Sequence, residues 1–160
     1  MSAAQQVVLL TGFPGSLLAR RVLAKLLAGE PTSTIVCVTP KQQLDAAESA
    51  LRTLPQEWRE RVELVWGDTA DMDFGMSGPR FLALSQRVDV VHHCAFATYA
   101  GVRREVAERI NVGGTGEVLE LCEAGDRRAR LVLWSTASVS GKQKGRIAET
   151  DLARPASFPS

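Results

Sequence analysis

Short, nearly uninterrupted apolar runs recur along this chain, and stretches with helical spacing separate them. The runs cover residues 7–11, 34–38, 62–66, 88–93 and 131–135, and the helical stretches cover 17–27, 44–54, 78–86 and 102–123. Strands that are apolar on both faces are typical of parallel sheets covered by helices on both sides. The alternating order implies right-handed crossovers between strands. We therefore predict an α/β fold with a doubly wound parallel sheet.

The end of the chain differs in composition from the rest. After Gly141 the sequence turns to Lys, Gly, Arg, Glu, Pro and Ser, and no periodic pattern continues. The total of 160 residues suits one domain with a sizeable core. We predict a folded domain over residues 1–141, and interpret 142–160 as a loop cut short, before the last strands of the sheet and any substrate-binding region.

Charge and cysteine content exclude several classes of function. With 19 basic and 18 acidic residues, the net charge of +1 gives no bulk attraction to nucleic acid or to an anionic membrane. Cys37, Cys94 and Cys122 are far apart in apolar stretches, which indicates buried free thiols rather than a disulfide or metal site. No apolar run reaches membrane-spanning length. We expect a soluble, cytoplasmic protein without a bound metal, and leave open whether it is a homodimer.

A glycine-containing turn lies between the first strand and the first helix. There, backbone amides and the helix dipole can face a pyrophosphate. The alternative is a tight turn that needs glycine only for its backbone angles. A P-loop is excluded because no Gly-Lys-Ser/Thr follows. The residues predicted to contact a dinucleotide here are Thr11, Gly12, Phe13, Pro14, Gly15, Ser16 and Leu17.

This turn resembles the Thr-Gly-x-x-Gly-x-x-Gly fingerprint of the extended short-chain dehydrogenases/reductases, a Rossmann-fold family. Leu18 stands in place of the third glycine, which normally permits close packing of the helix on the strand. The resemblance implies an NAD(P) cofactor. Gly67-Asp68, after the third strand, resembles a Gly-Asp pair of this family, and the resemblance implies that Asp68 contacts the adenine amino group. The alternative is that Asp68 only forms a turn.

The end of the second strand bears on the choice between NADP and NAD. An acidic residue there usually reads the ribose of NAD, whereas a base accommodates the extra phosphate of NADP. Here the strand runs into Val-Thr-Pro-Lys with no carboxylate. Thr39 and Lys41 therefore favour NADP, with NAD as the alternative if Lys41 is only a solvated loop lysine.

Two further segments, one on the fourth predicted strand and one in the last predicted helix, resemble site motifs of the family. The run His92-His93-Cys94-Ala95-Phe96 is similar to a strand that ends in His/Asn-x-Ala-Ala, and implies that Cys94, Ala95 and Phe96 lie along the cofactor. Two adjacent histidines cannot share one face of a strand, so a metal site is not expected. Asn111 is the first residue of a segment that resembles the family's Asn-x-x-Gly-Thr signature. The resemblance implies that Asn111 bends the helix and orders a proton-relay water.

The segment after the fifth predicted strand resembles the one that ends at the family's catalytic hydroxyl. Counting back from Gly141 assigns that hydroxyl to Thr136, with Ser135 beside the cofactor; Ser135 or Ser138 takes the catalytic place if the alignment shifts. A hydroxyl-rich turn held by local hydrogen bonds is the structural alternative.

The general acid of the family, a Tyr followed four residues later by Lys, has no match here. The only tyrosine, Tyr99, is followed at that spacing by Arg103 and precedes the predicted catalytic strand, so we interpret it as a loop or substrate-side aromatic. The Tyr-x-x-x-Lys helix is expected just beyond Ser160. Because general acid catalysis contributes about 10²- to 10⁴-fold in rate, we expect the 160-residue polypeptide alone to be inactive or nearly so.

Three functions remain open. Within the family, the turn, residues 73–77 and Ser135-Thr136-Ala137 look like the thioester-reductase and fatty-acyl-reductase branch, which implies NADPH-dependent reduction of a carrier-bound or coenzyme-A-bound acyl group or another small carbonyl compound. A nucleotide-sugar epimerase or dehydratase is the second possibility, although an acidic ribose ligand would then be usual. The third is a non-catalytic dinucleotide-binding or interaction module.

Overall fold

A five-stranded parallel sheet forms the centre of the computed structural model, which describes residues 5–150. Along the sheet the strands follow the order β3-β2-β1-β4-β5. This arrangement confirms the predicted doubly wound α/β fold. The strands are β1 (Val7–Thr11), β2 (Thr34–Thr39), β3 (Val62–Trp66), β4 (Val90–His93) and β5 (Arg130–Leu133).

Strand β1 lies in the middle of the sheet, with β2 on one side and β4 on the other. Leu9 is paired with Val36 of β2 and with Val91 of β4, and all three side chains are fully buried. The chain moves outward from β1 through β2 to β3, then returns to β4 on the opposite side. Because the direction of winding reverses between β1 and β4, their carboxyl ends leave a crevice, which is where ligands bind in such sheets.

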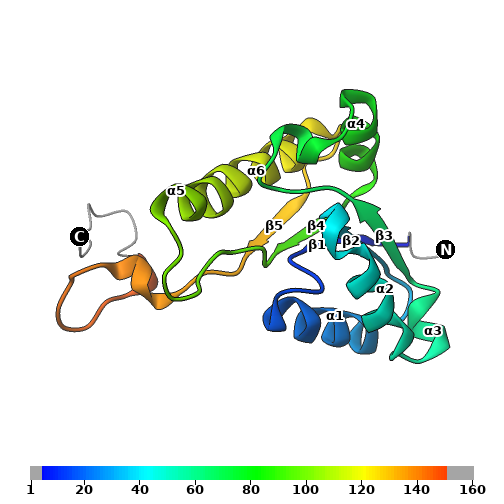
Figure 1. Ribbon diagram of the computed structural model, residues 1–160, viewed down its shortest axis with the longest axis horizontal. Helices are drawn as coiled ribbons and strands as arrows, with labels where there is room; N and C mark the ends of the chain where they lie inside the picture. The colour runs from blue at the N-terminus through cyan, green and yellow to red at the C-terminus, as the bar shows by residue number, and fades with distance from the viewer. Residues whose placement is uncertain (1–4, 151–160) are drawn as a thin grey trace.

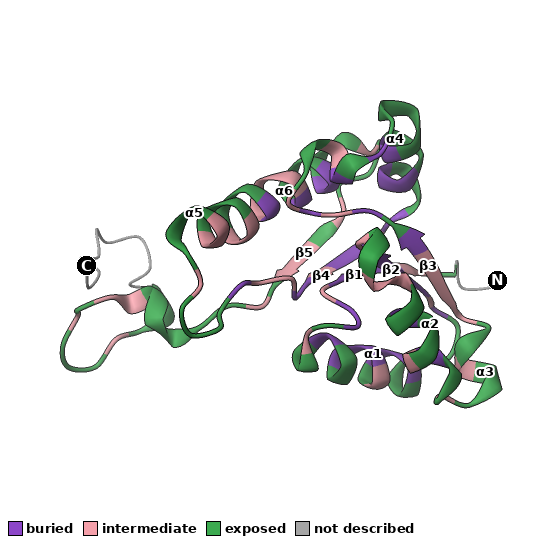
Figure 2. Ribbon diagram, viewed as in Figure 1, coloured by how far each residue is buried: buried purple, intermediate pink, exposed green. Residues whose placement is uncertain are grey.

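Helices cover both faces of the sheet (Figure 1). The helices α1 (Leu17–Gly29), α2 (Leu44–Arg52) and α3 (Gln56–Arg59) lie on one side, and α4 (Gly78–Arg87), α5 (Arg104–Ala107) and α6 (Gly114–Ala124) on the other. Each face has its own apolar cluster. Leu10, Leu23 and Leu27 belong to the α1 side, whereas Phe74, Val91 and Leu121 belong to the α6 side. Figure 2 shows the buried residues concentrated along the central strands and the inner faces of the helices.

The predicted long helix over 102–123 is interrupted, as its Asn-x-x-Gly-Thr segment suggested, but the chain stays helical there. A π-helical segment, η3 (Glu108–Gly113), joins α5 to α6. Single π-turns inside helices are common at functional sites. The interruption therefore reshapes the helix beside the crevice rather than ending it.

Other boundaries differ from the sequence-based expectations in small ways. The fifth strand ends at Leu133 rather than Ser135, and the fourth begins at Val90 rather than Val88. The one-turn helix α3 was not expected. Neither were the short 3-10 segments η1 (Lys41–Gln43), η2 (Met72–Gly75) and η4 (Ala137–Ser140). Three- and four-residue elements carry too little periodicity to be seen in a sequence.

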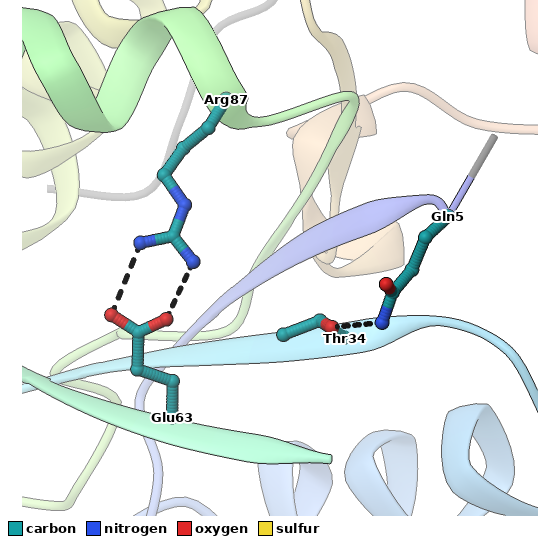
Figure 3. Close-up of polar contacts among 4 residues, drawn as sticks. All are labelled: Gln5, Thr34, Glu63 and Arg87. Carbon is teal, nitrogen blue, oxygen red and sulfur yellow. Dashed lines mark hydrogen bonds and ion pairs between the residues drawn. The ribbon is translucent and has the colours of Figure 1, made fainter.

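Side-chain hydrogen bonds connect segments that are distant in the sequence (Figure 3). Arg87, at the end of α4, donates to both carboxylate oxygens of Glu63 on β3, at 3.1 and 2.5 Å. Gln5, which precedes β1, donates to the hydroxyl of Thr34 at the start of β2 at 2.8 Å. Exposed pairs of this kind are worth about 1 kcal/mol or less, so the apolar clusters carry most of the stability. Within residues 5–150 no helix is long and apolar enough to cross a bilayer.

Candidate functional site

A cleft of about 630 Å³ opens at the carboxyl ends of β1, β2, β3 and β4. It lies over the crevice between β1 and β4, as the strand order requires. Four loops line it, and each contains residues that the sequence had singled out. The predicted residues that line it are Thr11, Gly12, Gly15, Ser16, Leu17, Gly67, Asp68, Cys94, Ala95 and Phe96.

The glycine turn brings the backbone of β1 against the end of β4. Gly12 has a φ of +85°, and a Cβ added there would lie 2.6 Å from the carbonyl oxygen of Cys94. Only glycine fits both constraints. The amide of Ser16 donates to Gly12 O at 2.8 Å, which closes the turn directly before α1.

Helix α1 presents an open amino terminus to the cleft. Ser16 is its N-cap, with the Oγ atom accepting from Ala19 N at 3.3 Å. The amides of Leu17 and Leu18 donate to no acceptor within residues 5–150, and the first turn contains no acidic side chain. Free amides and the helix dipole make such a terminus favourable for an anion. The arrangement fits the pyrophosphate of a dinucleotide.

Leu18, which replaces the third glycine of the fingerprint, does not obstruct this packing. Its side chain is 38% exposed and points to the rim of the cleft, whereas the next residue, Ala19, is fully buried against the sheet. The small residue needed for close approach of helix and strand is therefore Ala19. The chain meets the packing requirement one position later than the fingerprint does.

Two predicted contact residues of the turn face the core instead of the cleft. Phe13 is 3% exposed within the α1-side cluster, and Pro14 is also buried. Thr39 is fully buried, and its hydroxyl donates to the carbonyl oxygen of Phe13 at 3.0 Å. The side chain of Thr39 thus supports the turn from below, and its hydroxyl is not free for a ribose phosphate.

Lys41 lies at the start of η1 with an exposed side chain, outside the residues that line the cleft. Its neighbours Pro40, Gln42 and Gln43 do line it. The Gln43 side chain lies close to the glycine turn, because its Oε1 atom would be 3.3 Å from a Cβ added at Gly15. The end of β2 therefore contributes amide groups to the cleft, with Lys41 beside the rim.

The loop after β3 supplies the next part of the wall. Asp68 accepts a hydrogen bond from Ala70 N through its Oδ1 atom at 3.0 Å, as a turn-forming Asp would. Its backbone amide donates to Phe74 O, and Phe74 is fully buried with a φ of +58°. The second carboxylate oxygen of Asp68 has no hydrogen-bond partner within residues 5–150. Both the turn interpretation and a contact to adenine are compatible with this geometry.

Thr11 joins β1 to the end of β4 through one hydroxyl group. Its Oγ1 accepts from the amides of Cys94 at 3.0 Å and Ala95 at 3.2 Å, and contacts His93 Nδ1 at 2.8 Å. Because the oxygen already accepts two hydrogen bonds, its proton goes to Nδ1. His93 is then a neutral imidazole with its own hydrogen on Nε2. The hydrogen bonds from their amides to Thr11 thus fix the backbone of Cys94 and Ala95, which line the cleft.

The two histidines point to opposite faces of β4, as their adjacency requires. His92 accepts from the indole nitrogen of Trp134 at 3.1 Å, whereas His93 packs edge-on against Phe96. Burial lowers the pKa of His93 to about 4, and burial also lowers the pKa of His92. Within the described chain, no cluster of three His, Cys, Asp or Glu side chains could hold a metal ion.

We expect the free energy of unfolding to decrease as the pH falls from about 6.5 towards 4, because of His93. In that interval the unfolded state binds a proton that folded His93 does not, so acid favours unfolding by up to about 1.4 kcal/mol per pH unit. Above the unfolded pKa the effect is absent. Urea denaturation at pH 7 and pH 5 measures it in the wild type and in His93→Gln. Equal pH dependence in the two proteins would contradict a neutral, buried His93, and His92→Gln should retain most of the wild-type slope.

The three cysteines are all free and buried. Burial raises the pKa of Cys37 and Cys94 to about 12 and that of Cys122 to about 11. Thiols with such pKa values are weak nucleophiles at neutral pH. The prediction of buried free thiols is confirmed.

Asn111 holds the loop after β4 against the π-helical segment. Its Oδ1 accepts from Ala97 N at 2.8 Å and its Nδ2 donates to Ala97 O at 3.1 Å. Its own carbonyl accepts from the Thr115 hydroxyl at 2.6 Å. The side chain therefore shapes the loop through one accepted and one donated hydrogen bond. The predicted relay itself stays a prediction.

The structure does not bring Ser135 and Thr136 into the cleft wall. Both side chains are exposed in the segment after β5. Thr136 caps η4, where its Oγ1 accepts from Ser138 N at 3.3 Å and its hydroxyl donates to Ser138 Oγ at 3.3 Å. The local hydroxyl turn that was considered as the structural alternative is present. The catalytic assignment of Thr136 stays a prediction.

The cleft also contains residues that the sequence analysis did not single out for it. Tyr99, interpreted as a loop or substrate-side aromatic, lies at its mouth with 63% of its surface exposed. Arg109 and Ile110 enter from η3. The available signal was their position one and two residues before Asn111, because distortions inside helices are frequent at functional sites.

Comparison with known proteins identifies the family of this chain. Residues 10–156 match the family described as Male sterility protein. The chain is 34% identical over 116 residues to the hybrid PKS-NRPS synthetase prlS of a fungal species (strain NRRL 50135), covering 72% of this chain and 3% of that protein. It is 30% identical over 150 residues to a putative fatty acyl-CoA reductase of Drosophila melanogaster, covering 87% and 27%.

A solved structure shows the same fold. The terminal R domain of the myxalamid PKS-NRPS pathway superposes with a TM-score of 0.78 at 26% identity, over 92% of this chain and 39% of that one. The chain thus spans a small part of its curated relatives and well under half of the R domain. It belongs to the Male sterility protein family of NAD(P)-binding domains, in the thioester-reductase branch of the extended short-chain dehydrogenases/reductases.

Proposed function

We propose that this chain is the cofactor-binding part of an NADP-dependent reductase that acts on an acyl thioester held by a carrier protein or coenzyme A, or on a related carbonyl compound. The observation that supports the proposal most is the glycine turn, which exposes free α1 amides to a cleft of dinucleotide size. A Cβ at Gly12 would occupy the space that lets the turn lie close to the backbone of Cys94 and to a cofactor. The residues present therefore fit the group that the family implies.

The names of the relatives support this substrate class. Two of them are named as a hybrid PKS-NRPS synthetase and a putative fatty acyl-CoA reductase, and the R domain is described as terminal in its pathway. Acyl groups in such systems are thioesters, and NADPH would supply the hydride that converts one to an aldehyde with release of the thiol. Leu17, Phe96 and Tyr99, which line the cleft, add apolar surface that suits an acyl chain.

In this proposal the chain's own residues bind and orient. The α1 amides hold the pyrophosphate, Asp68 contacts the adenine amino group, and Cys94, Ala95 and Phe96 form the wall beside the nicotinamide. Ser135 lies near the cofactor, Thr136 positions the carbonyl oxygen, and Asn111 supports the proton relay. Lys41 adds positive charge near the rim on the ribose side. The lack of an acidic residue at the end of β2 disfavours the alternative of an epimerase with tightly held NAD.

Thr136→Ala is expected to reduce kcat about 10²-fold, with little change in NADPH affinity, in the longest natural form of the protein. The reason is that a hydroxyl oriented towards the carbonyl oxygen acts only on the reacting atoms. Steady-state oxidation of NADPH with an acyl thioester substrate measures kcat, and intrinsic fluorescence measures cofactor affinity. Ser138→Ala is the matched control from the same turn. If Ser138→Ala or Ser135→Ala lowers kcat and Thr136→Ala does not, the serine whose loss lowers kcat is the catalytic hydroxyl instead of Thr136.

The same assays separate the other functions. Tightly retained NAD without net turnover would identify an epimerase or dehydratase. Reversible NADPH binding without turnover of any thioester or aldehyde would identify a binding module. Thioester-dependent oxidation of NADPH supports the reductase.

A further inference from the structure

The cleft contains one cationic side chain within the described part of the chain. The residues that line the cleft include Arg109, and apart from it only Asp68 carries a charge. Arg109 comes from η3, on the side of the sheet opposite α1 (Figure 1). It therefore lies on a different wall of the cleft from the glycine turn. A positive charge in this place has no role in the function proposed above.

The helix that carries Arg109 is closely packed on the adenosine side of the cleft. A Cβ on Gly114, five residues later, would lie 3.2 Å from Thr69 O, which follows Asp68 directly. The Nη1 atom of Arg109 is 3.9 Å from Asp71 Oδ1. These two contacts place the guanidinium beside the loop predicted to hold adenine, rather than beside the nicotinamide end.

The current partner of Arg109 holds it only weakly. The side chains of Arg109 and Asp71 are 63% and 54% exposed, and 3.9 Å is a long ion pair. Exposed pairs of this kind contribute about 1 kcal/mol or less. A phosphate dianion would be a stronger partner, because a guanidinium donates two parallel hydrogen bonds to it.

The opposite wall does not provide a cation inside the cleft. The end of β2 presents Pro40, Gln42 and Gln43, while Lys41 lies outside the lining residues. The Thr39 hydroxyl is used by Phe13 O. A phosphate on the adenosine ribose would therefore find uncharged amides on the β2 side and a guanidinium across the cleft.

We propose that Arg109 binds the 2′-phosphate of NADPH and is the main determinant of NADP preference in this protein. The inference rests on the proposed function, because it presupposes a dinucleotide in the cleft. Arg109 exchanges its weak contact with Asp71 for the phosphate, while Gln43 borders the same ribose from the other side. Lys41 then adds only long-range attraction.

The test uses two fragments of the cofactor, 2′,5′-ADP and 5′-AMP, which differ by the phosphate in question. Each is titrated calorimetrically into the wild type, Arg109→Gln, Arg109→Lys and Arg104→Gln. Arg104 is the matched control, because it is an exposed arginine of α5 paired with Glu108 and lies outside the cleft. We expect Arg109→Gln to weaken 2′,5′-ADP at least tenfold and 5′-AMP less than twofold, with Arg109→Lys intermediate and Arg104→Gln unchanged.

The outcomes distinguish this inference from the proposed function. If the wild type prefers 2′,5′-ADP to 5′-AMP and Arg109→Gln retains that preference, the inference is wrong and the NADP assignment stands. Equal weakening of both fragments in Arg109→Gln also overturns it, because Arg109 would then contact the base. If the wild type shows no preference between the fragments, the NADP assignment fails first and the inference fails with it.

Discussion

Gly12→Ala is expected to lower the free energy of unfolding by roughly 3 kcal/mol or more and to abolish NADPH binding. The residue has a φ of +85°, a region that costs alanine at least about 1 kcal/mol. Its new Cβ would also lie 2.6 Å from Cys94 O and 2.7 Å from Cys94 C. These are backbone atoms at the end of β4, so the clash can be relieved only by opening the crevice. Urea denaturation and a fluorescence titration with NADPH measure the two effects.

Gly29→Ala is the matched control for this substitution. Gly29 ends α1, has no atom within 4 Å of an added Cβ and does not have a positive φ. Alanine there should leave stability unchanged or raise it by less than about 1 kcal/mol, with NADPH affinity unaffected. A Gly12→Ala protein as stable as Gly29→Ala, with wild-type affinity, would mean that the turn is not held against β4.

The sheet could be predicted closely because its strands are buried on both faces. Side chains on both faces of these strands are covered by helices, so residues such as Leu9, Val36 and Val91 are apolar. The strands are therefore visible in the sequence as continuous apolar runs. The bounds of β1 and β3 match the expected ranges. The η2 segment could not be foreseen, because Asp73 and Phe74 adopt positive φ values that packing imposes. Phe74 is drawn into the α6-side cluster, while Asp73 N donates to Glu117, 44 residues away.

The candidate site was predictable as a set of loops but not as a set of side-chain directions. The Rossmann order alone determines that the turn after β1 and the loops after β3 and β4 meet at one edge. Thr39 was expected in the cleft, yet its hydroxyl is 3.0 Å from Phe13 O, a contact between residues 26 positions apart that no local pattern reveals. Arg109 was not expected there, because an arginine on an amphipathic helix usually marks its solvated face. Arg109 is indeed exposed, but it also lines the cleft, because η3 lies along that rim.

One hydroxyl group connects the two halves of the sheet at the crevice. Thr11 Oγ1 accepts from Cys94 N and Ala95 N and donates to His93 Nδ1, so three polar groups from the end of β4 depend on it. Thr11 and His93 are both fully buried, and water cannot easily replace the hydroxyl. The β4 end that is fixed in this way is also the wall against which the nicotinamide half of the cofactor is proposed to lie.

Thr11→Val is therefore expected to lower the free energy of unfolding by about 3–5 kcal/mol, since each polar group left unpaired in a buried place costs about 1–3 kcal/mol. Valine has nearly the shape of threonine, so the loss reports on the hydroxyl rather than on a cavity. Thr11→Ser retains the hydroxyl and should lose much less. Urea denaturation of the three proteins at pH 7 measures the difference, and NADPH titration of Thr11→Ser tests whether the wall still forms. If Thr11→Val stays within about 1 kcal/mol of the wild type, the hydrogen-bonded pairing of β1 with β4 holds the crevice without the hydroxyl.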